Sequence, residues 1–158
     1  MNRSLFYKVF VSVVICLAVG GVSGYLTSGA ISTWYEQLNK PFFNPPDWVF
    51  GPVWSLLYTL MGISAGIIWH QGIDQKAVKK ALIVFGVHLL FNFSWSLIFF
   101  GLKMPVLAFI EIIILLGSIL YFSRLFYTIK PITAWMQIPY MLWVSFATVL
   151  NGAIAWLN

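Results

Sequence analysis

The stretch KPFFNPPDWVFGPVW, residues 40–54, separates two long apolar runs and decides how the rest of the chain is interpreted. It contains four prolines, three phenylalanines and two tryptophans in fifteen residues. Proline fixes φ and removes a backbone donor, so this segment is stiff and does not continue the preceding run as a helix. We therefore expect a pre-formed aromatic loop, with Pro52 in the first turns of the helix that follows.

The composition of the chain indicates an integral membrane protein. Of its 158 residues, 61% are hydrophobic and only 8% are charged, and the mean hydropathy is +0.90. An ordinary soluble domain carries about 25% charged residues, and a soluble fold of this length could not bury so much apolar surface. The net charge of +5 is spread over the ends of the apolar runs. It lacks the basic stripe of a nucleic-acid-binding protein, so no nucleic-acid partner is expected.

Five apolar segments are long enough to cross a membrane. Each has about 20 residues or more, which spans a hydrocarbon core of about 30 Å as a helix. Strands are not expected, because period-two alternation is absent and an open sheet edge has no partners in lipid. The predicted fold is an all-α integral membrane protein, a single five-helix transmembrane domain over residues 1–158. Its predicted spans are residues 5–25, 47–69, 81–102, 105–127 and 133–157, with an outer loop over residues 28–46.

The basic residues predict the orientation of these spans. The first apolar run is interpreted as a span and not as a cleaved signal peptide, because it is long and no small-residue cleavage site closes it. The positive-inside rule then places the N-terminus in the cytoplasm and the C-terminus outside the cell membrane. The predicted inner residues are Arg3, Lys8, Lys76, Lys79, Lys80, Arg124 and Lys130, against Lys40 and Lys103 outside.

Three of the predicted helices each carry a face of polar and aromatic residues spaced three or four positions apart. Amides and imidazoles that face lipid are costly, so we expect these faces to turn inward. The helical rise puts them at matching depths, roughly 10–20 Å below the outer ends. They would line one cavity beneath the loop. The faces are Trp54, Tyr58, Met61 and Ala65; His88, Asn92, Trp95 and Phe99; and Trp143, Ala147 and Asn151.

These inward residues also have a purely structural interpretation. Asn92, Asn151 and His88 can instead serve as hydrogen-bonding partners between helices. Glu111 is expected to be protonated or hydrogen-bonded, to Ser96 or to the Trp95 indole. Phosphate-binding glycine loops, zinc motifs, CxxC and paired carboxylates are missing from the sequence. We therefore expect no metal site and no obligatory cofactor.

Three segments match the signature of one known family, in order and over nearly the whole chain. They are WYEQLNKPFFNPPDWVFGPVWSLLYTLMG (34–62), FNFSWSLIFFGL (91–102) and PYMLWVSFATVLN (139–151). They resemble the tryptophan-rich sensory protein/translocator protein (TspO/MBR) family, also called the peripheral benzodiazepine receptor family. The resemblance implies a five-helix bundle, often a homodimer, whose cavity binds protoporphyrin IX-type porphyrins, isoquinoline carboxamides and benzodiazepines. Carried onto matching positions, its ligand-binding residues would be Tyr35, Trp54, Tyr58, Asn92, Trp95, Trp143, Ala147 and Leu150.

The resemblance also implies a chemistry and leaves one family property doubtful. Some members promote light- and oxygen-dependent breakdown of bound porphyrin, and this would make Trp54 and Trp143 photo-oxidative residues here. Animal members carry a proposed cholesterol motif, Leu/Val-x-Tyr-x-Lys/Arg, at the end of the fifth helix. The segment VLNGAIAWLN (149–158) has neither the tyrosine nor the basic residue, so cholesterol binding is not expected.

The resemblance therefore implies a bacterial porphyrin-binding membrane protein. Its expected partners are porphyrins, small hydrophobic ligands, membrane lipids and a second copy of the chain. Two alternatives stay open at this point. One is a passive carrier of porphyrins or lipids across the membrane, and the other is a stress-related scaffold or sensor.

Overall fold

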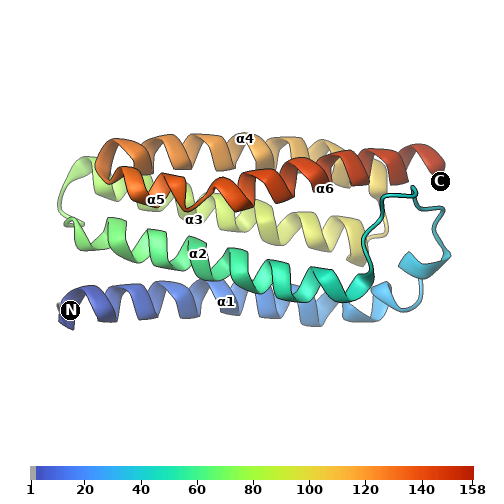
Figure 1. Ribbon diagram of the computed structural model, residues 1–158, viewed down its shortest axis with the longest axis horizontal. Helices are drawn as coiled ribbons and strands as arrows, with labels where there is room; N and C mark the ends of the chain where they lie inside the picture. The colour runs from blue at the N-terminus through green and yellow to red at the C-terminus, as the bar shows by residue number, and fades with distance from the viewer. Residues whose placement is uncertain (1–2) are drawn as a thin grey trace.

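The computed structural model describes residues 3–158 as helices packed side by side in an elongated bundle (Figure 1). Within that range there is no strand. Five helical segments of the same range are long and apolar enough to cross a membrane. The predicted all-α membrane fold is thus confirmed. In chain order the elements are α1 (Arg3–Ile31), η1 (Tyr35–Gln37), η2 (Asp47–Val49), α2 (Phe50–His70), α3 (Lys76–Ser96), η3 (Leu97–Gly101), α4 (Pro105–Ile129), α5 (Pro131–Trp135) and α6 (Ile138–Leu157).

The helix ends differ from the predicted spans in several places, among them the start of α3, which lies at Lys76 and not at residue 81. Helix α1 continues to Ile31, beyond the end expected at residue 25, so the loop after it is shorter than predicted. The fifth span is two helices, α5 and α6, which meet between residues 135 and 138. Pro139 causes this break, because it has no N–H to donate to the carbonyl of Trp135.

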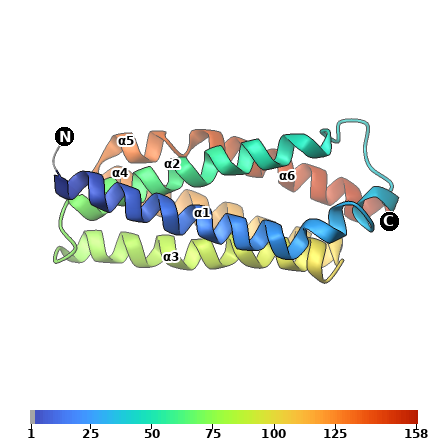
Figure 2. The same ribbon diagram turned by 90° about the horizontal axis from the view of Figure 1, so that it is seen from below.

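Helices α1 and α2 pack closely through two glycines of α2. A Cβ atom at Gly62 or Gly66 would collide with the backbone of Val13 or Val9, so only glycine permits this approach. The contact lies in the half of the bundle near the N-terminus. Toward the other end α1 and α2 diverge (Figure 2). This divergence makes room for the cavity described below.

The close α1–α2 contact gives a first testable prediction. Replacing Gly66 by alanine is expected to lower the free energy of unfolding by about 1–3 kcal/mol, because the new methyl meets backbone that cannot rotate away. Gly86→Ala is the matched control, since a Cβ on this exposed glycine of α3 meets no atom within 4 Å. It should leave stability unchanged or raise it by up to about 1 kcal/mol. Thermal unfolding in one detergent measures both, and equal midpoints would contradict the prediction.

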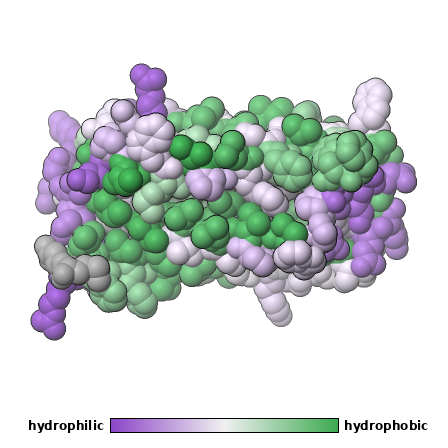
Figure 3. Space-filling view, viewed as in Figure 1, coloured by the Kyte–Doolittle hydropathy of each residue, from purple (hydrophilic) through white to green (hydrophobic). Residues whose placement is uncertain are grey.

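The surface of the bundle has an apolar belt between two polar ends (Figure 3). The N-terminal end of α1, the α2–α3 turn and the α4–α5 junction lie at one end, and the loop after α1 and the C-terminus lie at the other (Figure 1). The seven basic residues expected in the cytoplasm therefore share one end of the molecule. Which membrane face this end meets stays a prediction.

Candidate functional site: an aromatic cavity beneath a proline-rich lid

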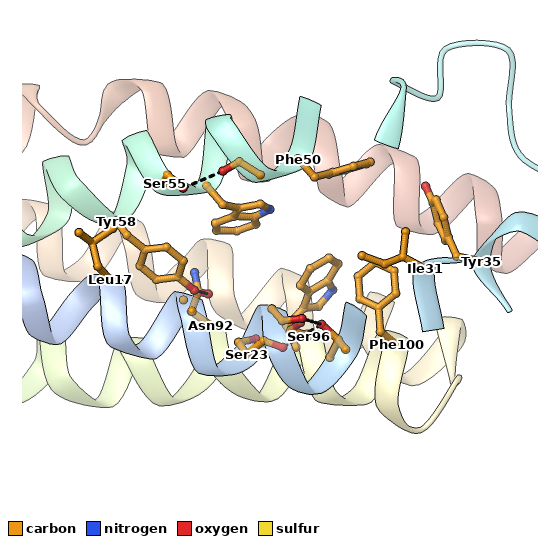
Figure 4. Close-up of a pocket in the computed structure, with 17 residues that line it drawn as sticks. Leu17, Ser23, Ile31, Tyr35, Phe50, Ser55, Tyr58, Asn92, Ser96 and Phe100 are labelled. Carbon is orange, nitrogen blue, oxygen red and sulfur yellow. Dashed lines mark hydrogen bonds between the residues drawn. The ribbon is translucent and has the colours of Figure 1, made fainter. Parts of the chain in front are cut away.

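A cavity of about 310 Å³ lies between α1, α2, α3 and η3, in the half of the bundle near the C-terminus. Tyr58 and Asn92 lie at its deep end, and Tyr35 and Phe100 lie toward the loop (Figure 4). The walls are mainly aromatic and aliphatic carbon, with a few hydroxyl and amide groups. Such a cavity suits a flat apolar ligand held in place by a small number of polar contacts.

One side of the cavity is built from small residues on the surface. Gly21 and Gly24 of α1 and Gly51 and Ser55 of α2 all belong to its lining, and all four are exposed. The ends of α1 and α2 that lie nearer the C-terminus diverge from each other (Figure 2). Because the surrounding surface is apolar, the cavity opens sideways toward the lipid as well as lying beneath the loop.

The indoles of Trp54 and Trp95 form the aromatic centre of the site. Their rings stack with centroids 6.5 Å apart and planes inclined by 30°. Trp54 also lies 5.7 Å from the ring of Tyr58, one helical turn away on α2. The Trp95 N–H donates to the Asn151 side-chain oxygen at 3.1 Å. Asn151 in turn donates to the Pro105 carbonyl at 2.8 Å, which fixes the orientation of the Trp95 indole.

The deep end of the cavity is closed by hydrogen-bonded side chains. The Tyr58 hydroxyl donates to Asn92 Oδ1 at 2.5 Å, and Asn92 Nδ2 donates to the Tyr140 hydroxyl. Asn92 is 2% exposed, yet it belongs to the cavity lining. Both interpretations of Asn92 therefore apply, because it lines the cavity and also links α2, α3 and α6.

The segment from residue 32 to residue 49, which we call the lid, covers the other end of the cavity. Within the lid, the Tyr35 side chain is buried and donates its hydroxyl proton to Asn44 Oδ1 at 2.6 Å. Burial raises the pKa of Tyr35 to about 12, and the nearby Asp47 carboxylate adds to this effect, so the phenol stays protonated at neutral pH. The Lys40 ammonium lies 4.5 Å above the Tyr35 ring centroid. The lid thus brings a cation to the mouth of the cavity.

The lid is also tied to the end of α6. The Asn39 N–H donates to the Asn158 side-chain oxygen at 3.0 Å, and the Asn158 amide donates to the Asn39 carbonyl at 3.0 Å. Phe43 of the lid packs edge-on against Phe146 of α6, with centroids 6.2 Å apart. These contacts hold the lid across the end of the bundle.

The predicted binding residues on α6 line a second and smaller space. It has a volume of about 30 Å³ and shares the Trp54 and Trp95 indoles with the larger cavity. The single cavity expected from the sequence is therefore two spaces on either side of this tryptophan pair. Of the predicted residues, Tyr35, Trp54 and Trp95 line both spaces; Tyr58 and Asn92 line the larger one; and Trp143, Ala147 and Leu150 line the smaller one.

Two expectations about polar residues need correction. His88 does not line either of these spaces, because it is completely buried between Ser118 and Tyr140. Glu111 bonds to neither Ser96 nor Trp95, because the hydroxyl that reaches it, at 3.1 Å, belongs to Ser94. Residues two positions apart on a helix point about 200° apart, so Ser94 and Ser96 cannot both face α4.

Sequence reasoning missed the contribution of α1. Gly20, Ser23, Thr27 and Ile31 all belong to the cavity lining, and Ser23 and Thr27 are buried. A signal was present, because these residues recur every three or four positions and form the small and polar face of an otherwise apolar helix. On α6 the sequence analysis also missed Tyr140, which accepts a hydrogen bond from Asn92. Tyr140 lies three residues before Trp143 and therefore on the same helical face.

The described residues suggest no metal centre. No group of three or more His, Cys, Asp or Glu side chains within residues 3–158 could hold an ion. The side chains that line the cavity offer aromatic stacking, apolar contact and hydrogen bonding.

Comparisons with known proteins agree with this architecture. The sequence profile of the TspO/MBR family matches residues 12–157. A "Tryptophan-rich protein TspO" from Archaeoglobus fulgidus is 39% identical over 152 residues, which cover 96% of this chain and 97% of that protein. The human "Translocator protein" is 35% identical over 123 residues, 77% of this chain and 72% of that protein. "Protein CrtK" from Rhodobacter capsulatus is 32% identical over 158 residues, all of this chain and 95% of that protein. The chain is thus a multi-pass membrane protein that belongs to the TspO/MBR family.

Proposed function

We propose that this membrane protein binds flat tetrapyrroles of the protoporphyrin IX type in the cavity beneath the lid. The observation that carries the proposal is the stacked pair of Trp54 and Trp95 in a mostly apolar cavity. Each favourable aromatic contact adds about 0.5–1.5 kcal/mol beyond the burial of apolar area. The same walls suit smaller flat ligands, including isoquinoline carboxamides and benzodiazepines.

The charges at the lid support an acidic ligand. Lys40 lies above the Tyr35 ring at the mouth of the cavity. A macrocycle that enters with its apolar edge toward Tyr58 would leave its propionate groups at this mouth. An ion pair with Lys40 there is partly exposed and worth about 0–1 kcal/mol, so it orients the ligand more than it binds it.

Titration of the purified protein with protoporphyrin IX tests the proposal. We expect saturable quenching of tryptophan fluorescence, because the ligand would lie against Trp54 and Trp95, together with a shift of the porphyrin absorbance band. Nanodiscs without protein give the signal from partition into lipid. If porphyrin uptake does not saturate, or if it equals the uptake by empty nanodiscs, the protein does not bind porphyrin at a specific site.

A passive carrier of porphyrins or lipids is the second candidate, and the exposed glycines at the lipid-facing side of the cavity favour it. However, the Tyr58–Asn92 bond closes the deep end about midway through the bundle. A carrier would therefore have to open the half of the bundle that Gly62 and Gly66 hold together. Porphyrin flux into liposomes separates the two candidates, because a binding protein without carrier activity leaves the flux at the level of empty liposomes.

Stiffness of the lid gives a second testable prediction. Pro45→Gly combined with Pro46→Gly should weaken porphyrin binding about fivefold, or about 1 kcal/mol, because the free lid would sample more conformations before binding. Pro131→Gly, at the start of α5 and far from the lid, is the matched control. Porphyrin titration gives the affinities of the wild-type protein and both variants. If the affinity of the lid variant is unchanged, the stiffness of the lid does not contribute to binding and the lid only packs against the bundle.

A further inference from the structure

A chain of hydrogen bonds leads from the deep end of the cavity to α4. Its members are Tyr58, Asn92, Tyr140, His88 and Ser118, and only the first two line the cavity. Beyond the bonds already given, the Tyr140 oxygen lies 3.1 Å from His88 Nε2, and His88 Nδ1 lies 2.7 Å from the Ser118 hydroxyl. We call this set the polar chain. Four of its members are at most 5% exposed.

The direction of the polar chain follows from where each proton must be, starting at Ser118. The Ser118 oxygen lies 2.6 Å from the Leu115 carbonyl oxygen, which has no proton to donate. The hydroxyl proton of Ser118 therefore points to Leu115. The Ser118 oxygen can only accept from His88, so the His88 proton lies on Nδ1. A buried imidazole between two neutral hydroxyl groups has no charged partner and stays neutral, which leaves Nε2 as an acceptor.

The protons of the remaining groups, from His88 to the cavity, can be assigned in the same way. Because His88 Nε2 is an acceptor, Tyr140 must donate its one proton there. The Tyr140 oxygen then accepts from Asn92 Nδ2, which turns Asn92 Oδ1 toward Tyr58. Tyr58 donates its proton to that oxygen. Every group is satisfied in this direction, and the Tyr58 oxygen offers the cavity a lone pair and no proton.

We propose that Tyr140, His88 and Ser118 are positioning residues that make Tyr58 a hydrogen-bond acceptor at the deep end of the cavity. The cavity then selects flat aromatic ligands that bring an N–H or O–H group to that end. In the opposite direction the Tyr58 proton would face the cavity and would select ligands with acceptor atoms. This inference rests on the proposed function in one respect, since it concerns the same cavity.

Two ligands of one shape test the inference. Carbazole carries an N–H where dibenzofuran carries an ether oxygen, and the three fused rings are otherwise alike. Affinities are measured by equilibrium dialysis of the protein in detergent, after subtraction of partition into empty micelles. The wild-type protein should prefer carbazole by about three- to tenfold, which corresponds to one net hydrogen bond.

Substitutions at Ser118 separate positioning from packing. Ser118→Ala removes the acceptor that holds the His88 proton on Nδ1, so either direction of the polar chain then leaves His88 Nδ1 without a partner, and the original direction loses its advantage. The preference for carbazole should then fall to about one. Ser118→Thr keeps a hydroxyl that can bond the same carbonyl and should restore the preference. A merely structural role would change stability in the alanine variant without changing the ratio of the two affinities.

Ser64→Ala is the matched control for Ser118→Ala. Ser64 is completely buried, donates to the Leu60 carbonyl at 2.8 Å and accepts from Gln137 at 2.7 Å, but it lies outside the cavity lining and the polar chain. Its loss should leave the ratio of affinities unchanged.

Three outcomes would overturn the inference. They are a wild-type protein that binds protoporphyrin IX but shows no preference, an unchanged ratio in Ser118→Ala, and an equal change in Ser64→Ala. A protein that prefers carbazole but does not bind protoporphyrin IX would support the inference and overturn the proposed function.

Discussion

Replacing Gly24 by phenylalanine is expected to lower the affinity for protoporphyrin IX by about 100-fold or more, equivalent to about 2.7 kcal/mol. Gly24 lines the cavity, and a Cβ built on it meets no atom within 4 Å. The new ring would therefore occupy space that the ligand needs, without displacing protein atoms. Each 100 Å² of apolar contact that the ligand loses costs about 2.5 kcal/mol, so even partial filling gives this loss.

Gly86→Phe is the matched control for this variant. A side chain at Gly86 also meets open space, but it projects from α3 on the surface and lies outside the cavity lining. It should bind porphyrin like the wild-type protein. Fluorescence titration gives the affinities, and thermal unfolding shows that both variants are folded. If a folded Gly24→Phe variant binds as tightly as the wild-type protein, porphyrin does not bind in this cavity.

The inward faces of the helices were readable from the sequence where large polar or aromatic residues repeat at helical spacing. Trp54 and Tyr58 on α2, and Asn92 and Trp95 on α3, do lie side by side in one cavity lining. Lipid makes this inference strong, because an amide has no partner in hydrocarbon and must turn inward. The approximate lengths of the helices could be predicted for a related reason, since each span has to cross the hydrocarbon core of the bilayer.

Other parts of the site depend on packing that helical periodicity does not contain. The face of α1 consists of Gly20, Ser23 and Thr27, which can serve close helix contact equally well, and only the divergence of α1 from α2 turns it into a cavity wall. Depth alone placed Trp143 in the same cavity as Trp54. The stacked indoles of Trp54 and Trp95 instead line both the larger and the smaller space, and Trp143 lines only the smaller one.

Removal of the Trp54 indole is expected to slow light-dependent breakdown of bound porphyrin at least about tenfold, a difference of about 1.4 kcal/mol in the activation free energy. The described side chains offer no acid–base pair or nucleophile aimed at the cavity, so the reactivity would come from the ligand, as it does in cofactor enzymes. In the proposed reaction the photoexcited porphyrin would accept an electron from a neighbouring indole and pass it to dioxygen. The superoxide formed would add to the macrocycle, and the adduct would return an electron to the indole. Trp54 lines both spaces, as Trp95 does, so a ligand in either space would touch its indole.

Three phenylalanine variants distinguish this role from stacking. Trp54→Phe keeps an aromatic surface, so its affinity for porphyrin should fall only a few-fold, while the photoreaction slows sharply. Trp143→Phe should slow the reaction less, because Trp143 lines only the smaller space and lies 6.1 Å from the Phe50 ring. Trp156→Phe changes an indole that is 89% exposed near the C-terminus and should have no effect. Porphyrin absorbance is followed under illumination with and without oxygen. The proposed breakdown of porphyrin requires the cavity indoles. If the absorbance falls at the same rate in all four proteins and in free porphyrin, the protein binds porphyrin without this reaction.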